Sequence, residues 1–466
     1  MAGRHPIRSE LLSLARLALP LAVASAGQAT MGLVDTAVCG RAGAVVLAGT
    51  GLGNALFFAI AVFGMGLMMG LDPLISQAFG AGDPRRARRL LWQGTWLALL
   101  TGALLAVPCA LVALALRPLG IEEAVALQAG RFVWVRAPSL PAFLFFVAAR
   151  SYLQGLGLTR AVVVSTVIAN ALNLLLDLLF VFGGAALPPW AGPLRAIPPM
   201  GSAGSALSTA LVTVVQALLL ALAARAVSID GGAAGLRRPS RSALLQAARA
   251  GLPVGLHMGA EVGVFALVGF LAARLGRDAL AAHQVAIALA STTFTFTVGI
   301  GSAAAVRVGW AVGARDTVGA RRAGLTAFGA GAGVMSISAL AFLLFPAALA
   351  RLMTDDASVL RAATPLLVVA AVFQISDGVQ GVGAGVLRGA GDTRYTFTAN
   401  MVGHWLVGFP IAIALGILGP FGVTGLWWGL CAGLSAVAAG LFGRFLRLSS
   451  REIVPLAGRA PRSAEG

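Results

Sequence analysis

Twelve long apolar stretches limit what this chain can fold into. Each covers about 20 residues or more, which is enough to cross the hydrocarbon core of a bilayer as a helix. The chain is 58% hydrophobic and only 11% charged, whereas soluble domains carry about 25% charged residues. We therefore predict an all-α integral membrane protein with twelve transmembrane helices, at residues 11–38, 46–79, 90–116, 125–152, 161–183, 201–224, 244–273, 279–311, 323–349, 358–387, 395–418 and 422–443.

The positions of the arginines predict the orientation. Arginine accounts for every basic side chain behind the net charge of +17, because the sequence contains no lysine. Arginines follow the even-numbered spans, and the intervening loops are poorer in arginine or carry acids. The positive-inside rule then places both termini in the cytoplasm. The basic N-terminus runs into the first span without a cleavage site, so it is not read as a removable signal peptide. The arginines form no single basic face, so we expect no nucleic-acid partner.

The sequence repeats itself. Residues 16–89 match residues 249–322 at an offset of 233, which pairs Pro20 with Pro253 and Asp83 with Asp316. Six spans per repeat predict two bundles of the same orientation, as in secondary transporters with a central cleft. The predicted parts are an N-terminal six-helix lobe at 1–225, a cytoplasmic linker at 226–243, a C-terminal six-helix lobe at 244–450 and a polar cytoplasmic tail at 451–466.

Glu261 and Asp377 are acids inside predicted spans seven and ten. A carboxylate at bilayer depth is unfavourable unless it faces a polar interior, which favours a function in transport over a simple structural hydrogen bond. The repeat pairs Glu261 with the neutral Gln28, and His257 lies one turn earlier on the same helix face. Asp377 has glutamines three residues to either side, at positions 374 and 380.

A second set of polar residues lies in the first half. Asn173 and Asp177 in span five are four residues apart and share a helix face, and Asp35 ends span one. Their oxygens suit Na⁺, or a carboxylate pair that shares a proton. The alternative for Asp35 is that it is merely solvated near the external surface. We interpret Asp72 as structural, beside the helix irregularity at Pro73.

No enzyme signature is found. The absence of lysine excludes a Walker A motif, and neither G-x-S-x-G nor H-E-x-x-H occurs. The three cysteines lie apart without metal-type spacing. His283, His404 and Tyr395 are interpreted as interhelical hydrogen-bonding groups, and Gly299-x-Gly301 as a point of close helix packing. We expect neither enzymatic activity nor a cofactor.

Several long motifs resemble the multidrug and toxic compound extrusion (MATE) family, in particular its NorM-like bacterial members. The resemblance covers about residues 10–445, and its strongest stretches are Val34-Asp35-Thr36, GLDPLISQAFGAGD at 70–83, AHQVAIALASTTFTFTVGIGSAAAVRVG at 282–309 and QISDGVQGVGAGVLRGAGDTR at 374–394.

The resemblance implies a MATE-like fold and an antiporter that exports cationic, amphipathic drugs or metabolites in exchange for inward H⁺ or Na⁺ by alternating access. It implies that cation coupling and substrate binding use acidic side chains at two sites. One site consists of Glu261 and Asp377, and the other of Asp35, Asn173 and Asp177. The supporting polar side chains are His257, Gln284 and Gln374. A Na⁺ ion could bind at either site. Some members carry a tyrosine where this chain has Phe373, which removes a possible cation ligand. The expected location is the bacterial cytoplasmic (inner) membrane, and the expected state is a monomer.

The nearest alternative is a flippase for a lipid-linked or amphipathic metabolite. Such a protein would need a more basic cleft for an anionic phosphate, whereas the buried charges of this chain are mainly acidic. A receptor or channel is a weaker alternative, because twin six-span halves suit alternating access. The sequence leaves open the natural substrate, the coupling ion and which lobe holds the dominant acid site.

Overall fold

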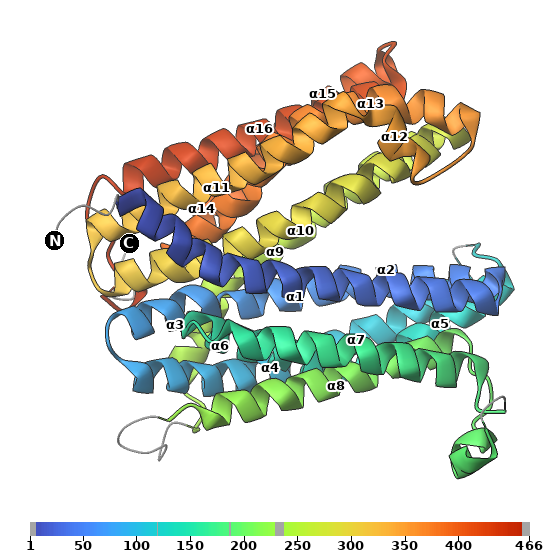
Figure 1. Cartoon of the computed structure of the whole chain (residues 1–466), viewed down its shortest axis with the longest axis horizontal. Coiled ribbons are helices and arrows are strands. Elements are labelled where there is room, and N and C mark those ends of the chain that lie inside the picture. The colour runs from blue at the N-terminus through green and yellow to red at the C-terminus, as the bar shows by residue number, and fades with distance from the viewer. Residues whose placement is uncertain (1–5, 119, 186–187, 229–236, 459–466) are drawn as a thin grey trace. The chain divides into compact units, whose positions relative to one another are not determined.

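The computed structural model describes residues 6–118, 120–185, 188–228 and 237–458, and it is helical throughout its spans (Figure 1). Within these residues twelve helical segments are long and apolar enough to cross a membrane, as predicted. The helices are α1 (Pro6–Ala42), α2 (Ala44–Met69), α3 (Leu71–Gly80), α4 (Pro84–Val112), α5 (Glu123–Arg136), α6 (Leu140–Gly155), α7 (Thr159–Phe182), α8 (Ser202–Ala226), α9 (Arg241–Arg274), α10 (Arg277–Gly313), α11 (Thr317–Leu344), α12 (Pro346–Arg351), α13 (Ala357–Gly389), α14 (Thr393–Asn400), α15 (Phe409–Ala412) and α16 (Gly422–Leu448).

Some spans differ in detail from the prediction. The ninth ends at Leu344 rather than at 349, because Pro346 lacks the N–H that would continue α11 and instead begins α12. The eleventh combines α14 and α15 with π-helical segments at Met401–Gly408 and Ile413–Leu418. Such π-helical turns are often found at functional sites.

Large apolar side chains cover the outside of the helices. Leu104, Ile337 and Leu406 are each more than two-thirds exposed to solvent. A water-soluble protein rarely exposes so much contiguous apolar surface, whereas lipid tails solvate it without penalty. The exposed leucines and isoleucines are therefore the lipid-facing surface of a membrane protein.

The chain forms two compact units. The first contains Met1–Ser25, Asp72–Pro84 and Leu256–Gly466, and the second contains Ala26–Leu71 and Arg85–Gly255. Both α1 and α9 pass from one unit to the other within their length. This grouping describes contacts rather than the sequence repeat, and the lobes at 1–225 and 244–450 stay a prediction.

The repeat is visible in the helix boundaries. The span formed by α2 and α3 begins at Ala44 and ends at Gly80, and α10 begins at Arg277 and ends at Gly313. The starts differ by 277 − 44 = 233 and the ends by 313 − 80 = 233, which is the offset found in the sequence.

In the first unit, glycines permit close contact between α10 and its neighbours. A Cβ on Gly385 would lie 2.1 Å from the carbonyl oxygen of Gly301, and one on Gly299 would lie 2.6 Å from the backbone nitrogen of Ala22. Both distances are impossible for a real side chain, so the backbones meet only because glycine has none. The interpretation of Gly299-x-Gly301 as a packing point is confirmed.

Ion pairs and caps fix helix ends in the same unit. Arg388 pairs with Asp72, with 3.0 Å between Nε and Oδ2, and Arg307 holds both carboxylate oxygens of Glu10. The Asp356 carboxylate caps α13 by accepting from the amide and hydroxyl of Ser358. The contact to Arg388 supports the structural interpretation of Asp72.

In the second unit a buried arginine links several helices by hydrogen bonds. Arg88 donates to the hydroxyl of Tyr152 and to the carbonyl oxygen of Val227, and thereby links α4, α6 and the residue after α8. Its apolar interior includes Phe57, Val133 and Leu140. Helices of this unit surround the second set of predicted site residues.

Candidate functional site

Glu261 lies on α9 in the first unit, within a small polar network. Its Oε2 atom is 3.1 Å from Nε2 of His257 and 3.4 Å from Nε2 of Gln380. The predicted one-turn spacing brings His257 to the carboxylate, and the side chains of His257 and Glu261 are 8% and 19% exposed. The carboxylate is thus held by one residue of its own helix and by one residue of α13.

Asp377 lies on α13 next to this network. It is 5% exposed and close enough to Glu261 for the two carboxyl groups to interact electrostatically. The two glutamines that flank it have different partners. Gln380 reaches Glu261, whereas Gln374 donates to Thr293 on α10 at 2.6 Å and to Ser338 on α11 at 2.8 Å. Gln374 therefore links α13 to α10 and α11, and its amide does not donate to Glu261 or Asp377.

His404 belongs to the same neighbourhood and was not predicted as a site residue. It is 2% exposed, interacts electrostatically with Glu261, and its ring centroid lies 6.3 Å from that of Phe265. Its Nε2 atom has no hydrogen-bond partner within the described residues. The interpretation as an interhelical hydrogen-bonding group is thus not supported at this nitrogen. No sequence pattern singles out this position, because the π-helical turn at Met401–Gly408 is visible only in the structure.

Phe373 forms an apolar wall one turn before Asp377. Its ring centroid lies 6.1 Å from that of Phe265 and 5.1 Å from that of Trp427. No oxygen ligand is available at this position, in agreement with the departure noted in the sequence. The first unit thus offers two carboxyl groups, two imidazoles and one amide around an aromatic wall.

Asp35, Asn173 and Asp177 come together in the second unit. Thr209 on α8 donates to Oδ2 of Asp35 at 3.1 Å, and Asp35 and Asp177 are close enough to interact. Asn173 and Asp177 are both 0% exposed, and the Asn173 amide donates to Ser208 at 3.3 Å. The interpretation of Asp35 as merely solvated does not fit these contacts.

Several oxygens of this cluster lack a hydrogen-bond donor. Within the described residues, no hydrogen bond of full geometry reaches the buried Oδ1 of Asp35, Oδ1 of Asn173, the two carboxylate oxygens of Asp177 or Oγ of Ser205, although the Ser205 and Ser208 hydroxyls lie close to Asp177. Buried polar atoms are nearly always hydrogen-bonded, so such a group calls for an explanation. A bound proton or a hard cation would satisfy it. We call these side chains together with Ser208 the oxygen cluster.

Side chains of α8 belong to the oxygen cluster or contact it, which was not predicted from the sequence. Ser205, Ser208 and Thr209 stand at helical spacing on one face of α8. That spacing is a usable signal, but serine and threonine are common in membrane helices and bond their own backbone. Only the contacts with α1 and α7 single out these three.

Arg136 was also missed. It ends α5, is 6% exposed, donates to the hydroxyl of Ser139 and lies over the ring of Phe57 at 4.5 Å. Its charge is close enough to Asp35 to interact with it. A buried arginine beside an acid in a membrane span could have been identified from the sequence, because charged residues there are rare.

Other residues have different roles. Gln284 is exposed on α10, and within the described part of the chain the hydrogen-bonding and ionic partners of Glu261 are His257 and Gln380. His283 accepts a hydrogen bond from the indole of Trp427 at 3.2 Å, which confirms its interpretation as an interhelical group. Tyr395 lies under the guanidinium of Arg444 at 5.1 Å. Among the described residues, no group of three or more His, Cys, Asp or Glu side chains could hold a metal ion.

The fold and the two acidic sites can now be compared with known proteins. The sequence profile of the MatE family matches residues 20–179 and 253–414, which together form more than half of the chain. The chain belongs to the MatE family. The match divides at the same repeat that the helix boundaries display, and the resemblance read from the sequence motifs is confirmed.

Relatives of this MatE protein extend over almost the whole chain. It is 35% identical over 445 residues to the "Probable multidrug resistance protein NorM" of Pseudomonas putida, covering 93% of each chain. It is 31% identical over 454 residues to the "Multidrug resistance protein NorM" of Aliivibrio fischeri, covering 95% of this chain and 96% of that one. A crystal structure described as MATE in complex with MaD3S shares the fold, with a TM-score of 0.83 and 21% identity over 95% of this chain and 96% of that chain.

Family membership decides the broad class of the protein. This MatE chain is a membrane transporter and not an enzyme, as the sequence analysis predicts. Its twelve apolar helices and bacterial relatives identify a multi-pass protein of the bacterial inner membrane. The roles of the individual acids belong to the proposal that follows.

Proposed function

We propose that this protein is a multidrug efflux antiporter that exports cationic, amphipathic compounds in exchange for inward H⁺ or Na⁺. Its NorM relatives are named as multidrug resistance proteins, which supports export of drugs. The observation that carries the coupling to a cation is the oxygen cluster of the second unit, with its unpartnered buried oxygens.

The oxygen cluster is proposed as the coupling site because an entering cation would supply what it lacks. A buried polar atom without a partner costs about 1–3 kcal/mol. A proton between Asp35 and Asp177 would join the two carboxyl groups and remove their repulsion. A Na⁺ ion would instead bind the carboxylate, amide and hydroxyl oxygens, which are hard ligands of the kind such ions prefer.

The Glu261 network is proposed as the second acidic site. Glu261 already has two partners, so an incoming cation must compete with His257 and Gln380 rather than fill an empty position. A protonated His257 would itself neutralise the carboxylate. Proton uptake and binding of a cationic substrate therefore exclude each other at Glu261, as exchange requires.

Alternating access follows from differential binding. A cation shifts the equilibrium between two conformations only as far as it binds one of them better. Neutralising the acids removes the attraction that holds a cationic drug, and losing the coupling ion restores it. The same carboxylates thereby link import of one cation to export of the other.

The acidic character of both sites also argues against the flippase alternative. A lipid-linked precursor carries anionic phosphate, which carboxylates would repel. In the second unit Arg136 does provide a buried positive charge, but it interacts electrostatically with Asp35. The proposal therefore favours cationic substrates.

The test is drug-dependent cation flux in proteoliposomes, with pH and Na⁺ gradients imposed separately. The variants are Asp35→Asn and Asp177→Asn in the oxygen cluster, and Glu261→Gln and Asp377→Asn in the other site. Asp355→Asn, an exposed acid between α12 and α13, is the matched control.

We expect both oxygen-cluster variants to abolish coupled flux, and Glu261→Gln to reduce it. The gradient that drives flux in the unmodified protein identifies the ion. Coupled flux that survives Asp35→Asn and Asp177→Asn would refute the oxygen cluster as the coupling site. Flux independent of both gradients would overturn antiport itself.

A further inference from the structure

A groove runs along α11 beside the first turns of α1. We call it the α1–α11 groove, and it is lined by Leu11, Val318, Arg321, Arg322, Leu325, Thr326, Gly329 and Ala330. Its volume is about 580 Å³, and all of its lining belongs to the first compact unit. Neither acidic site contributes to it.

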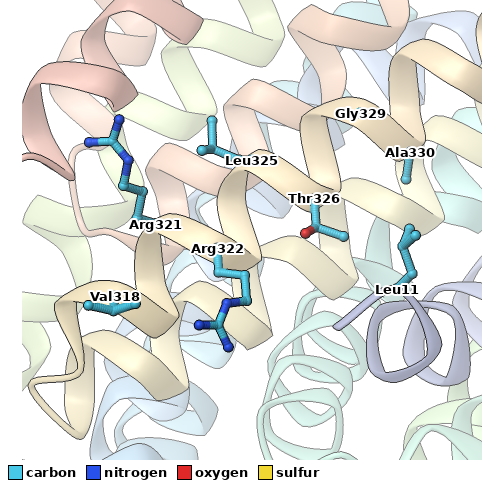
Figure 2. A pocket seen from close by; sticks show the side chains of 8 residues that line it. All are labelled: Leu11, Val318, Arg321, Arg322, Leu325, Thr326, Gly329 and Ala330. Atoms are coloured by element: carbon cyan, nitrogen blue, oxygen red, sulfur yellow. The ribbon is translucent and has the colours of Figure 1, made fainter. Parts of the chain in front are cut away.

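The groove has a charged end and an apolar end. Figure 2 shows the side chains of Arg321 and Arg322 toward one end of the row, and Leu11, Gly329 and Ala330 toward the other. Arg322 and Ala330 are eight residues apart on one helix, which corresponds to about 12 Å along its axis. A ligand that fits must be anionic at one end and apolar over the rest.

No ion pair engages Arg321 or Arg322 in the part of the chain that the structure describes. Both are exposed. The nearby acids are already engaged, because Glu10 pairs with Arg307 and Asp316 accepts from the backbone of Gly319. The positive charge at this end of the groove is therefore available to a ligand.

The repeat provides a comparison. Arg321 corresponds to Arg88 at the offset of 233, and Arg88 is buried against Tyr152 and Val227. At the neighbouring offset of 234, the position of Tyr152 is taken by Val386, which has no hydroxyl. Arg88 of the first half thus donates hydrogen bonds within the fold. Among the described residues, its counterpart Arg321 in the second half makes no ion pair.

An ion pair fixes the first turns of α1, which line the groove through Leu11. Glu10, the residue before Leu11, binds Arg307 with distances of 3.0 and 2.7 Å, which fixes the start of α1 against α10. Arg8 lies one turn before Leu11 on α1 and is exposed. On α11, a Cβ built at Gly329 would meet nothing within 4 Å, so the groove is open there.

From these features we propose that the α1–α11 groove binds one anionic phospholipid of the surrounding bilayer. The lipid phosphate contacts Arg321 and Arg322, and an acyl chain lies along Leu325, Gly329 and Ala330 against Leu11. Arginines at a membrane surface attract anionic headgroups, and basic pockets between transmembrane helices bind them specifically. The bilayer is the source of the ligand, because the apolar end would contribute nothing toward a free phosphate ion.

The test is lipid binding to the purified full-length protein by native mass spectrometry and lipid-dependent thermal stability. Phosphatidylglycerol and cardiolipin are the anionic probes, and phosphatidylcholine is the neutral one. Arg321→Gln with Arg322→Gln removes the charge, and Gly329→Leu fills the groove. Arg447→Gln with Arg451→Gln makes the same change in net charge at other exposed arginines, and Gly333→Leu adds the same side chain where nothing lies within 4 Å.

We expect saturable binding of the anionic lipids to weaken about fivefold for each arginine removed. Gly329→Leu should abolish the saturable component, and both control variants should bind like the unmodified protein. Because Gly329 is exposed, its substitution should leave folding intact, and Gly329→Ala provides a smaller step. Equal binding of phosphatidylcholine, or an equal loss in either control variant, would overturn the proposal.

Discussion

Replacing Asp177 with asparagine should stabilise the protein while it abolishes coupling. Asp177 is 0% exposed, and within the described residues no donor reaches either of its oxygens with full hydrogen-bond geometry, although the hydroxyls of Ser205 and Ser208 lie close to the carboxylate. An asparagine keeps one oxygen and turns the other into an amide that can donate to the carboxylate of Asp35. Helix propensities of the two residues are similar, so α7 itself should not change.

The magnitude follows from the unpartnered atoms. One unsatisfied buried polar atom costs about 1–3 kcal/mol, and the substitution satisfies one of two. We therefore expect Asp177→Asn to raise the free energy of unfolding by about 1–3 kcal/mol. The substitution also removes one of two neighbouring carboxyl groups, and with it the repulsion that arises when both carry a charge.

The assay is denaturant-induced unfolding in detergent micelles, followed by tryptophan fluorescence. Asp355→Asn serves as the control, because its exposed side chain should give no change in stability. If Asp177→Asn lowers the stability, or changes it no more than the control does, the unpartnered oxygens are not a source of strain. The oxygen cluster would then not require a bound cation.

Three further predictions concern stability. Asp72→Asn or Arg388→Gln alone should lower the free energy of unfolding by about 3–5 kcal/mol, because each leaves a buried charge unpaired. In the same assay the double variant should lose less stability than the sum of the two single losses. If the two losses simply add, the pairing is contradicted. Gly385→Ala should cost at least about 1–3 kcal/mol, because its methyl group meets backbone at 2.1 Å; Gly333→Ala, which meets nothing, should be neutral or stabilising by up to about 1 kcal/mol. Hydrogen bonds from the hydroxyl and the amide of the residue two places on hold the pKa of Asp356 below its usual value. This cap should therefore stabilise the first turn of α13 above the ordinary aspartate range and lose its effect as pH falls through the lowered pKa; amide hydrogen exchange that does not change on acidification would argue against it.

Much of the site was accessible from spacing along single helices. The pair His257 and Glu261, and the pair Asn173 and Asp177, were predicted because residues four apart share a helix face. The contacts of His257 confirm the first pair. Gln374 shows the limit of this reasoning. Its spacing from Asp377 suggested a partner of the acid, yet it binds Thr293 and Ser338 on two other helices.

The sequence by itself determined the twelve spans, the internal repeat and the family, because hydropathy and motif spacing are properties of contiguous residues. Only the tertiary structure decided which acids are satisfied. It paired Asp72 with Arg388, brought His404 toward Glu261 and, within the described residues, left the oxygens of Asp177 without a donor of full hydrogen-bond geometry. These outcomes depend on how each helix is rotated against its neighbours. That rotation is set by close packing at positions such as Gly301 and Gly385, between residues far apart in the chain.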